Sequence, residues 1–193
     1  MEAFELALQH GCDGFEFDVR YTRDGRCVIC HDAIHRRRRI GARMFRELDL
    51  PPAEEVVRRF AARAYLDIEL KVAGDARAIH QALQGHGRDQ YVISSFLPSV
   101  LESVAATLPG MPAGLICENL RQLRAWPRLP VTALMLHLGL VTPALIEELQ
   151  AASKQVFVWT VNQRRDMERI ASLGVDGLIS DDTHLLAETF PRS

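Results

Sequence analysis

The sequence has few of the features that mark specialised protein classes. It holds four cysteines in 193 residues, and the closest two, Cys27 and Cys30, lie in an apparent strand that would point them to opposite faces. We therefore interpret the cysteines as reduced structural thiols rather than disulfides or zinc ligands. No apolar run reaches the length of a membrane span, and the stretch 1–11 lacks the basic and apolar regions of a signal peptide. We expect a cytoplasmic protein with no stable membrane insertion.

An excess of charge of one sign is also lacking. The chain carries 23 Lys and Arg against 25 Asp and Glu, a formal net charge of −2, which gives no electrostatic case for a nucleic-acid partner. The one concentrated basic run is Arg36–Arg39. Such a run is typical of a solvated loop, and the alternative is a clamp for a phosphate or a lipid headgroup. A hydrophobic content of 48% is enough for the core of a single domain, 1–193.

Two hydrophobic periodicities alternate along the chain. Short runs rich in β-branched and aromatic residues predict strands, and the segments between them, with apolar residues three and four apart, predict helices. This alternation predicts an α/β fold of parallel strands joined by crossover helices. The predicted strands are 14–19, 64–70, 91–96, 113–117, 131–137, 155–161 and 176–180, and the helices are 53–63, 75–86, 98–108, 118–126, 143–153 and 163–174.

A glycine-rich phosphate loop is absent after every predicted strand, which weakens the case for a nucleotide-binding, doubly wound sheet. Polar residues recur instead where the strands end. In a barrel these ends meet on one face, where barrel enzymes keep their sites. We therefore predict a TIM (β/α)8-type barrel, incomplete in this chain, with seven barrel strands and a β-hairpin excursion. The polar residues are Asp18, Lys71, Ser94, Ser95, His137, Asn162 and Asp181.

The stretch GFEFDVRYTRDGRCVICHD, residues 14–32, places acids and a histidine in one hairpin. Strand alternation puts Glu16 and Asp18 on one face, where two carboxylates repel each other unless a cation lies between them or water surrounds them. The pair Asp24-Gly25 predicts a two-residue type I′ turn, whose register places Asp18 opposite His31. The alternative is a solvated hairpin whose acids and histidine merely face water.

A third acid lies in YLDIELK, residues 65–71, where Glu69 and Lys71 share a face and Asp67 lies deeper on it. An ion pair that caps the strand would explain this segment alone. Together with the hairpin acids, Glu69 completes a set of oxygen ligands for a hard divalent cation, Mg²⁺ or Ca²⁺. Lys71 would supply a point charge for a substrate phosphate.

The order of these motifs resembles the glycerophosphodiester phosphodiesterase family, relatives of the phosphatidylinositol phospholipases. The matching motifs lie between Phe4 and Asp181 and are, in order, GFEFDV, T, DG, V, HD, IELK, ISSF, WTVN and GVDGLISD. The resemblance implies a TIM barrel that hydrolyses a small-molecule phosphodiester, a glycerophosphodiester, to glycerol 3-phosphate and an alcohol with a divalent metal. It also implies roles for six residues: Glu16, Asp18 and Glu69 as metal ligands, His31 as general acid or base, Lys71 as a phosphate contact and Trp159 as a pocket wall.

The assignment of Trp159 leaves an alternative, and four further matching residues are left without a role. Trp159 would serve equally well as ordinary barrel core, because aromatic residues dominate cores generally. Ser94, Ser95, Phe96 and Asn162 match family motifs, but buried polar side chains at strand ends usually bond nearby backbone, so we assign them no role.

The chain also departs from the family pattern. Family members begin with a strand ending in His-Arg-Gly and a Pro-Glu-Asn-Thr-like segment, whereas this chain starts at the helix matched by EAFELALQHG. We therefore expect an N-terminally truncated domain with weak or lost activity, because losing one acid–base partner costs roughly 10²–10⁴-fold in rate. The alternatives are a misplaced start, an impaired barrel that binds metal and phosphate, and a subunit completed by a partner, such as a homodimer. His137 is the best internal substitute for the missing histidine; His10 should face away from the site, and His35 should lie in a solvated loop.

Overall fold

The computed structural model describes residues 1–191, so the last two residues of the predicted domain lie outside the described residues. Eight strands form one sheet in the order β10-β9-β8-β7-β6-β5-β1-β2. All neighbours are parallel except β2, which is antiparallel to β1. The strands are β1 (Gly14–Tyr21), β2 (Cys27–Ile29), β5 (Tyr65–Leu70), β6 (Tyr91–Ser95), β7 (Ala113–Cys117), β8 (Ala133–His137), β9 (Gln155–Trp159) and β10 (Gly177–Leu178).

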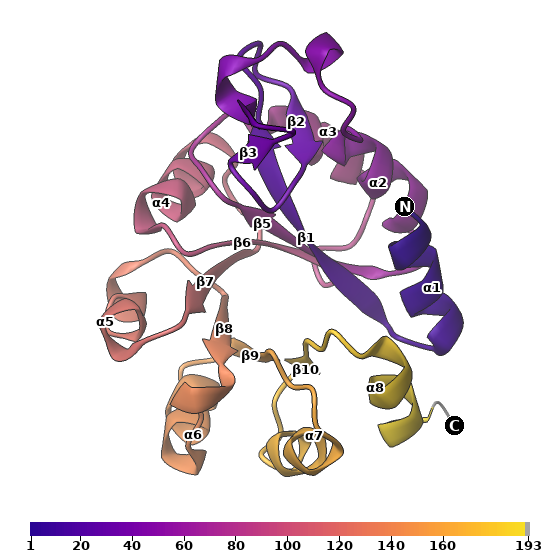
Figure 1. The fold of residues 1–193 in the computed structure, drawn as a ribbon. Helices are drawn as coiled ribbons and strands as arrows, with labels where there is room; N and C mark the ends of the chain where they lie inside the picture. The colour runs from indigo at the N-terminus through magenta and orange to yellow at the C-terminus, as the bar shows by residue number, and fades with distance from the viewer. Residues whose placement is uncertain (192–193) are drawn as a thin grey trace.

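The sheet curls into an incomplete barrel with the helices on its outside (Figure 1). All seven predicted barrel strands and the hairpin excursion are present, so the fold prediction is confirmed. A separate two-stranded ribbon, β3 (Ile34–His35) and β4 (Arg38–Arg39), follows the hairpin. The helices are α1 (Glu2–His10), α2 (Ala53–Phe60), α3 (Arg77–Leu83), α4 (Pro98–Thr107), α5 (Leu120–Leu123), α6 (Pro143–Ala151), α7 (Arg164–Ala171) and α8 (Thr183–Thr189).

Strand alternation divides the side chains between two layers. On β5, Leu66 and Ile68 are fully buried in the core that the sheet forms with its helices, and Phe60 of α2 belongs to the same core. A smaller cluster, which includes Val92 and Met135, joins residues of β6 to β9. Burial on both faces explains why these parallel strands are nearly continuous apolar runs.

The barrel is open between β1 and β10, which are not paired in the described part of the chain. Helices α1 and α8 lie side by side near this opening (Figure 1). Helix α8 was not among the predicted helices. It begins where the Asp182 side chain accepts a hydrogen bond from the backbone N–H of Leu185, a capping contact that its short sequence only weakly signals. Among the described residues, no helix combines the length and apolarity needed to cross a bilayer.

Candidate active site

Two adjacent strands bring the three predicted acids together. Glu16 and Asp18 lie on β1, Glu69 lies on β5, and the parallel register places Asp18 directly beside Glu69. One carboxylate oxygen from each of the three lies within 4.8 Å of the others. The alternation of β1 and β5 alone is enough to direct all three side chains into the same space.

Glu16 is the member of this cluster that lacks a partner. Its Oε1 is buried and has no hydrogen bond among the described residues. Burial, together with the charges of Asp18, Asp67 and Glu69, raises the pKa of Glu16 to about 9. A buried carboxyl oxygen without a donor is costly unless it is protonated or meets a cation. Three carboxylates around one point are a donor set that fits Mg²⁺ or Ca²⁺.

Lys71 neutralises the other two acids. Its Nζ lies 3.0 Å from Asp18 Oδ1 and 2.8 Å from Glu69 Oε1. Burial lowers the pKa of Lys71, but its bonds to Glu69 and Asp18 outweigh this effect, and the net shift is upward. The ion pair considered as an explanation of the 65–71 segment is therefore present, and it lies within the acidic cluster.

A buried polar pair lies beneath the acids. Asp67 neighbours Glu16 in the β1–β5 register, and Ser94 Oγ donates a hydrogen bond of 2.5 Å to Asp67 Oδ1. Burial raises the pKa of Asp67 to about 7. Ser95 Oγ donates instead to the Leu70 carbonyl, the kind of backbone bond expected for both serines. Ser94 is thus a site-supporting residue that the sequence argument missed, and only its position beside Asp67 across the strands could have indicated it.

Aromatic side chains form a wall beside the charges. Lys71 Nζ lies 5.6 Å from the centre of the Phe96 ring, and Phe96 meets Trp159 edge to face at 5.7 Å. Trp159 Nε1 donates to the Met135 carbonyl at 3.0 Å, and the Trp159 ring contacts His137 at 5.2 Å. Trp159 is half-buried, so part of its ring remains available to a ligand. Phe96, which the sequence argument left without a role, connects this wall to Lys71.

The predicted register of the hairpin is wrong by one residue. Val19 pairs with Ile29, and the Cys30 N–H donates to the Asp18 carbonyl, so Asp18 faces Cys30 rather than His31. The turn holds three residues instead of two, with Gly25 in the left-handed conformation at φ 75°. Such three-residue turns are the next commonest after the two-residue type. His31 is consequently 73% exposed and bonds Asp32 at 2.9 Å.

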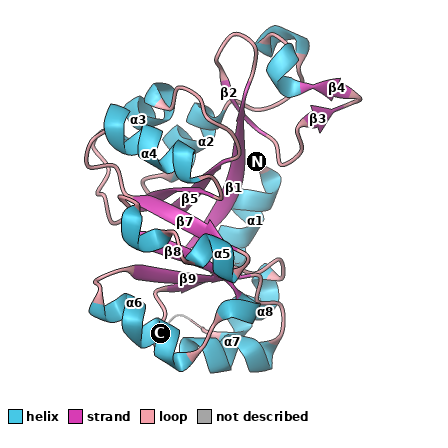
Figure 2. Ribbon diagram, turned by 90° about the vertical axis from the view of Figure 1, so that its left-hand side faces the viewer, coloured by secondary structure: helices cyan, strands magenta, loops and turns pink. Residues whose placement is uncertain are grey.

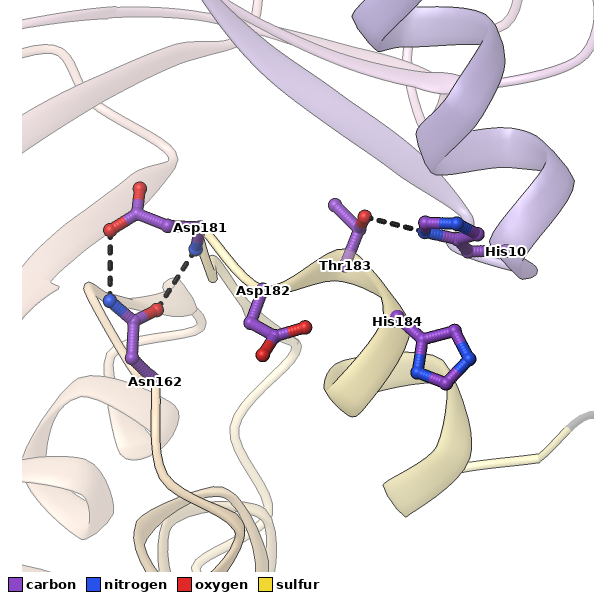
Figure 3. A pocket seen from close by; sticks show the side chains of 6 residues that line it. All are labelled: His10, Asn162, Asp181, Asp182, Thr183 and His184. Carbon is purple, nitrogen blue, oxygen red and sulfur yellow. Dashed lines mark hydrogen bonds between the residues drawn. The ribbon is translucent and has the colours of Figure 1, made fainter.

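A second polar group lies around the opening of the barrel, in a pocket of about 470 Å³ (Figure 3). Asn162 donates to Asp181, and a hydrogen bond of 2.8 Å joins His10 Nδ1 to Thr183 Oγ1. His10 therefore lies beside the start of α8, and none of the three acids lines the pocket around it. These hydrogen bonds join the end of α1 to the start of α8, and Asn162 to Asp181. The residues that line it are His10, Asn162, Asp181, Asp182, Thr183 and His184.

Comparison with known proteins agrees with this fold. A glycerophosphodiester phosphodiesterase of Caldanaerobacter subterraneus is 27% identical, over 95% of this chain and 88% of the relative. The structure of an Oleispira antarctica phosphodiesterase in complex with the product sn-glycerol-3-phosphate has a TM-score of 0.86 at 21% identity, covering 99% of this chain and 90% of that one. A glycerophosphodiester phosphodiesterase from Thermotoga maritima has a TM-score of 0.80 at 21% identity, covering 97% and 89%.

These structural likenesses establish the barrel fold, and the assignment to a family comes from the sequence. The profile of the glycerophosphoryl diester phosphodiesterase family matches residues 1–56 and 59–185, nearly the whole chain. The chain therefore belongs to the glycerophosphoryl diester phosphodiesterase family, a family of phosphoric diester hydrolases.

Proposed function

We propose that this protein hydrolyses a glycerophosphodiester to glycerol 3-phosphate and an alcohol with the help of a divalent cation, Mg²⁺ or Ca²⁺. The observation that carries the proposal is the meeting of Glu16, Asp18 and Glu69 within 4.8 Å, with one buried oxygen of Glu16 left without a partner. A bound cation would supply Lewis-acid stabilisation of charge on the phosphodiester oxygens.

The other residues take roles that follow from their positions. Lys71 would turn its ammonium from the acids toward a substrate phosphate, since a cation among the carboxylates replaces the charge that it now supplies. Trp159 would line the glycerol or headgroup side of the site, next to Phe96. His31 would transfer the proton, after a side-chain or loop movement that brings it from Asp32 to the substrate.

The test is release of glycerol 3-phosphate from glycerophosphocholine. With Mg²⁺ or Ca²⁺ present, we expect product from the wild-type protein and none above background in EDTA or from Glu16→Gln. Glu55→Gln, which removes an exposed glutamate from α2, is the matched control and should keep wild-type activity. A folded protein that yields no product with either metal would refute the proposal.

One observation favours a second candidate function, binding of metal and phosphate without turnover. His31 is the predicted acid–base residue, yet it is exposed and bonded to Asp32, and His137 contacts Trp159 rather than the acids. Neither His31 nor His137 therefore forms a hydrogen bond with the acids of the cluster in the described structure. Calorimetry distinguishes the two functions: binding of Mg²⁺ and glycerol 3-phosphate without product formation would support the second.

The predicted homodimer would be tested by light scattering at micromolar concentration, where a clean monomer would refute it.

A further inference from the structure

The ribbon β3–β4 carries an unusual concentration of free positive charge. It places Arg36–Arg39 at its tip and stands out from the body of the molecule (Figure 2). Arg36 bonds Asp49 at 3.1 Å. The guanidinium groups of Arg37, Arg38 and Arg39 are exposed and form no ion pair or hydrogen bond with any described residue. Three unpaired cations on one short ribbon are unexpected in a chain whose net charge is −2.

The backbone of this turn is unusual as well. The pair His35 and Arg38 closes a two-residue turn in which Arg36 and Arg37 have φ angles of 45° and 64°. Such turns favour Asn-Gly, because residues with a Cβ rarely adopt positive φ. Arginines in these two positions carry a conformational cost, and backbone strain of this kind is typical of functional segments.

Exposed apolar side chains lie on the same face. Six large apolar side chains are exposed among residues 1–191. Three of them lie two or three residues beyond the carboxyl ends of β5, β6 and β7, and a fourth begins the arginine ribbon. A shallow pocket of about 360 Å³ joins Val72 to Ala33 and Arg39 of the ribbon segment, so the two features are adjacent. The four side chains are Val72, Leu97, Leu120 and Ile34, which are 36% to 59% exposed.

This face is also the one that holds the acids, because Lys71 directly precedes Val72 at the end of β5. From this arrangement we infer that the carboxyl-end face of the barrel docks on an anionic lipid membrane surface. The arginines meet the lipid phosphates and the apolar side chains enter the headgroup boundary. Unpaired basic residues combined with exposed apolar ones are what such a surface attracts. Docking in this orientation turns the mouth of the acidic cluster toward the lipid.

The expected strength of membrane binding follows from the three unpaired arginines, Arg37, Arg38 and Arg39. Each basic residue near an anionic leaflet contributes about 1 kcal/mol, or about fivefold in the partition coefficient, so three together give on the order of a hundredfold. This attraction falls steeply at high salt, because charges farther apart than the Debye length no longer interact. The apolar side chains add a contribution that does not depend on salt.

Vesicle sedimentation tests the inference because it measures membrane binding and does not depend on catalytic activity. The wild-type protein should bind vesicles in which a third of the lipid is phosphatidylglycerol far more tightly than vesicles of phosphatidylcholine alone. The variant Arg37→Gln/Arg38→Gln/Arg39→Gln should lose on the order of a hundredfold in partition coefficient at low salt. It should still hydrolyse soluble glycerophosphocholine as the wild type does, since its arginines have no place among the catalytic groups.

A matched control removes the same charge elsewhere. Arg58→Gln/Arg88→Gln/Arg128→Gln deletes three exposed arginines, two of which precede β6 and β8 at the amino ends of the strands. Equal loss of binding in both triple variants would show a net-charge effect only and overturn the inference. Wild-type protein that ignores phosphatidylglycerol vesicles, or that binds RNA and not vesicles, would overturn it as well.

A second pair of variants tests the contribution of the exposed apolar side chains to membrane binding. Leu97→Ser/Leu120→Ser should weaken binding to phosphatidylglycerol vesicles roughly tenfold or more. Leu6→Ser/Phe190→Ser, whose side chains are 49% and 41% exposed on α1 and at the end of α8, should leave the binding unchanged. Unaltered binding by the first variant would refute apolar insertion. Far-ultraviolet circular dichroism confirms that each variant is folded.

Discussion

Glu16 should destabilise the metal-free protein and stabilise the metal-bound one. Its pKa rises from an ordinary 4.5 to about 9, first because it is buried and then because Asp18, Asp67 and Glu69 surround it. A carboxyl group with a raised pKa favours folding fully only below its unfolded pKa. Its stabilising contribution is lost as the pH climbs from about 4.5 toward 9.

The size of the effect follows from linkage. At pH 7 the folded protein keeps Glu16 protonated while the unfolded chain ionises it, a penalty of about 1.4 kcal/mol for each of roughly 2.5 pH units. Replacing Glu16 by Gln removes about 3.5 kcal/mol of penalty at pH 7 and almost none at pH 4.5. Metal at a thousand times its Kd reverses the order of stability, because it adds about 4.1 kcal/mol to the wild type, and the neutral amide is a poorer ligand.

Urea unfolding at pH 4.5, 7 and 9, in EDTA and in excess Mg²⁺ or Ca²⁺, measures both effects. We expect Glu16→Gln to be the more stable protein in EDTA at pH 7 and to gain little from metal. Glu55→Gln removes a glutamate exposed on α2 and should follow the wild type throughout. The reasoning fails if Glu16→Gln is no more stable than the wild type in EDTA, or if its advantage does not shrink toward pH 4.5.

Three further changes probe the rest of the site. Lys71→Met leaves the two carboxylates it bridges without a counter-charge, so urea unfolding in EDTA should show a loss of about 3 kcal/mol that Mg²⁺ restores; equal losses with and without metal would contradict this. Ser94→Ala takes away the donor to buried Asp67 and should cost about 1–3 kcal/mol in the same assay; an unchanged midpoint would show that the bond contributes nothing. Trp159→Leu should raise the KM for glycerophosphocholine; a lower melting temperature with an unchanged KM would assign Trp159 to the core alone.

Much of the fold could be predicted because each barrel strand carries its own signal. In β5, every second residue is apolar and fully buried, and the intervening Asp67 and Glu69 face the opposite way. This alternation is local, so a single sequence is enough to read it. The convergence of Glu16, Asp18 and Glu69 follows from the alternation together with parallel pairing of consecutive strands.

The turn of the hairpin was predicted wrongly because its conformation depends on contacts with residues distant in the sequence. Asp24-Gly25 is compatible with both a two-residue and a three-residue turn, and the structure adopts the longer one, with the Thr22 hydroxyl bonded to Asp24 at 2.7 Å. Asp24 also accepts a bond from the Phe45 N–H, a residue far along the chain. Contacts with a distant loop thus select the turn, and the sequence of the hairpin cannot report them. The partner of His10 lies likewise far along the chain, at the start of α8.

The two halves of the proposed chemistry are therefore positioned by different means. The carboxylates are fixed by a six-residue parallel register between β1 and β5, where a slip of one residue would turn the acids toward the apolar core. His31 depends on a turn and a loop that leave it exposed beside Asp32. The positions of the carboxylates are set by the sheet and the position of His31 by a loop, so a substitution can alter one without altering the other. Metal binding should for this reason survive substitutions in the turn, whereas the rate of hydrolysis should not.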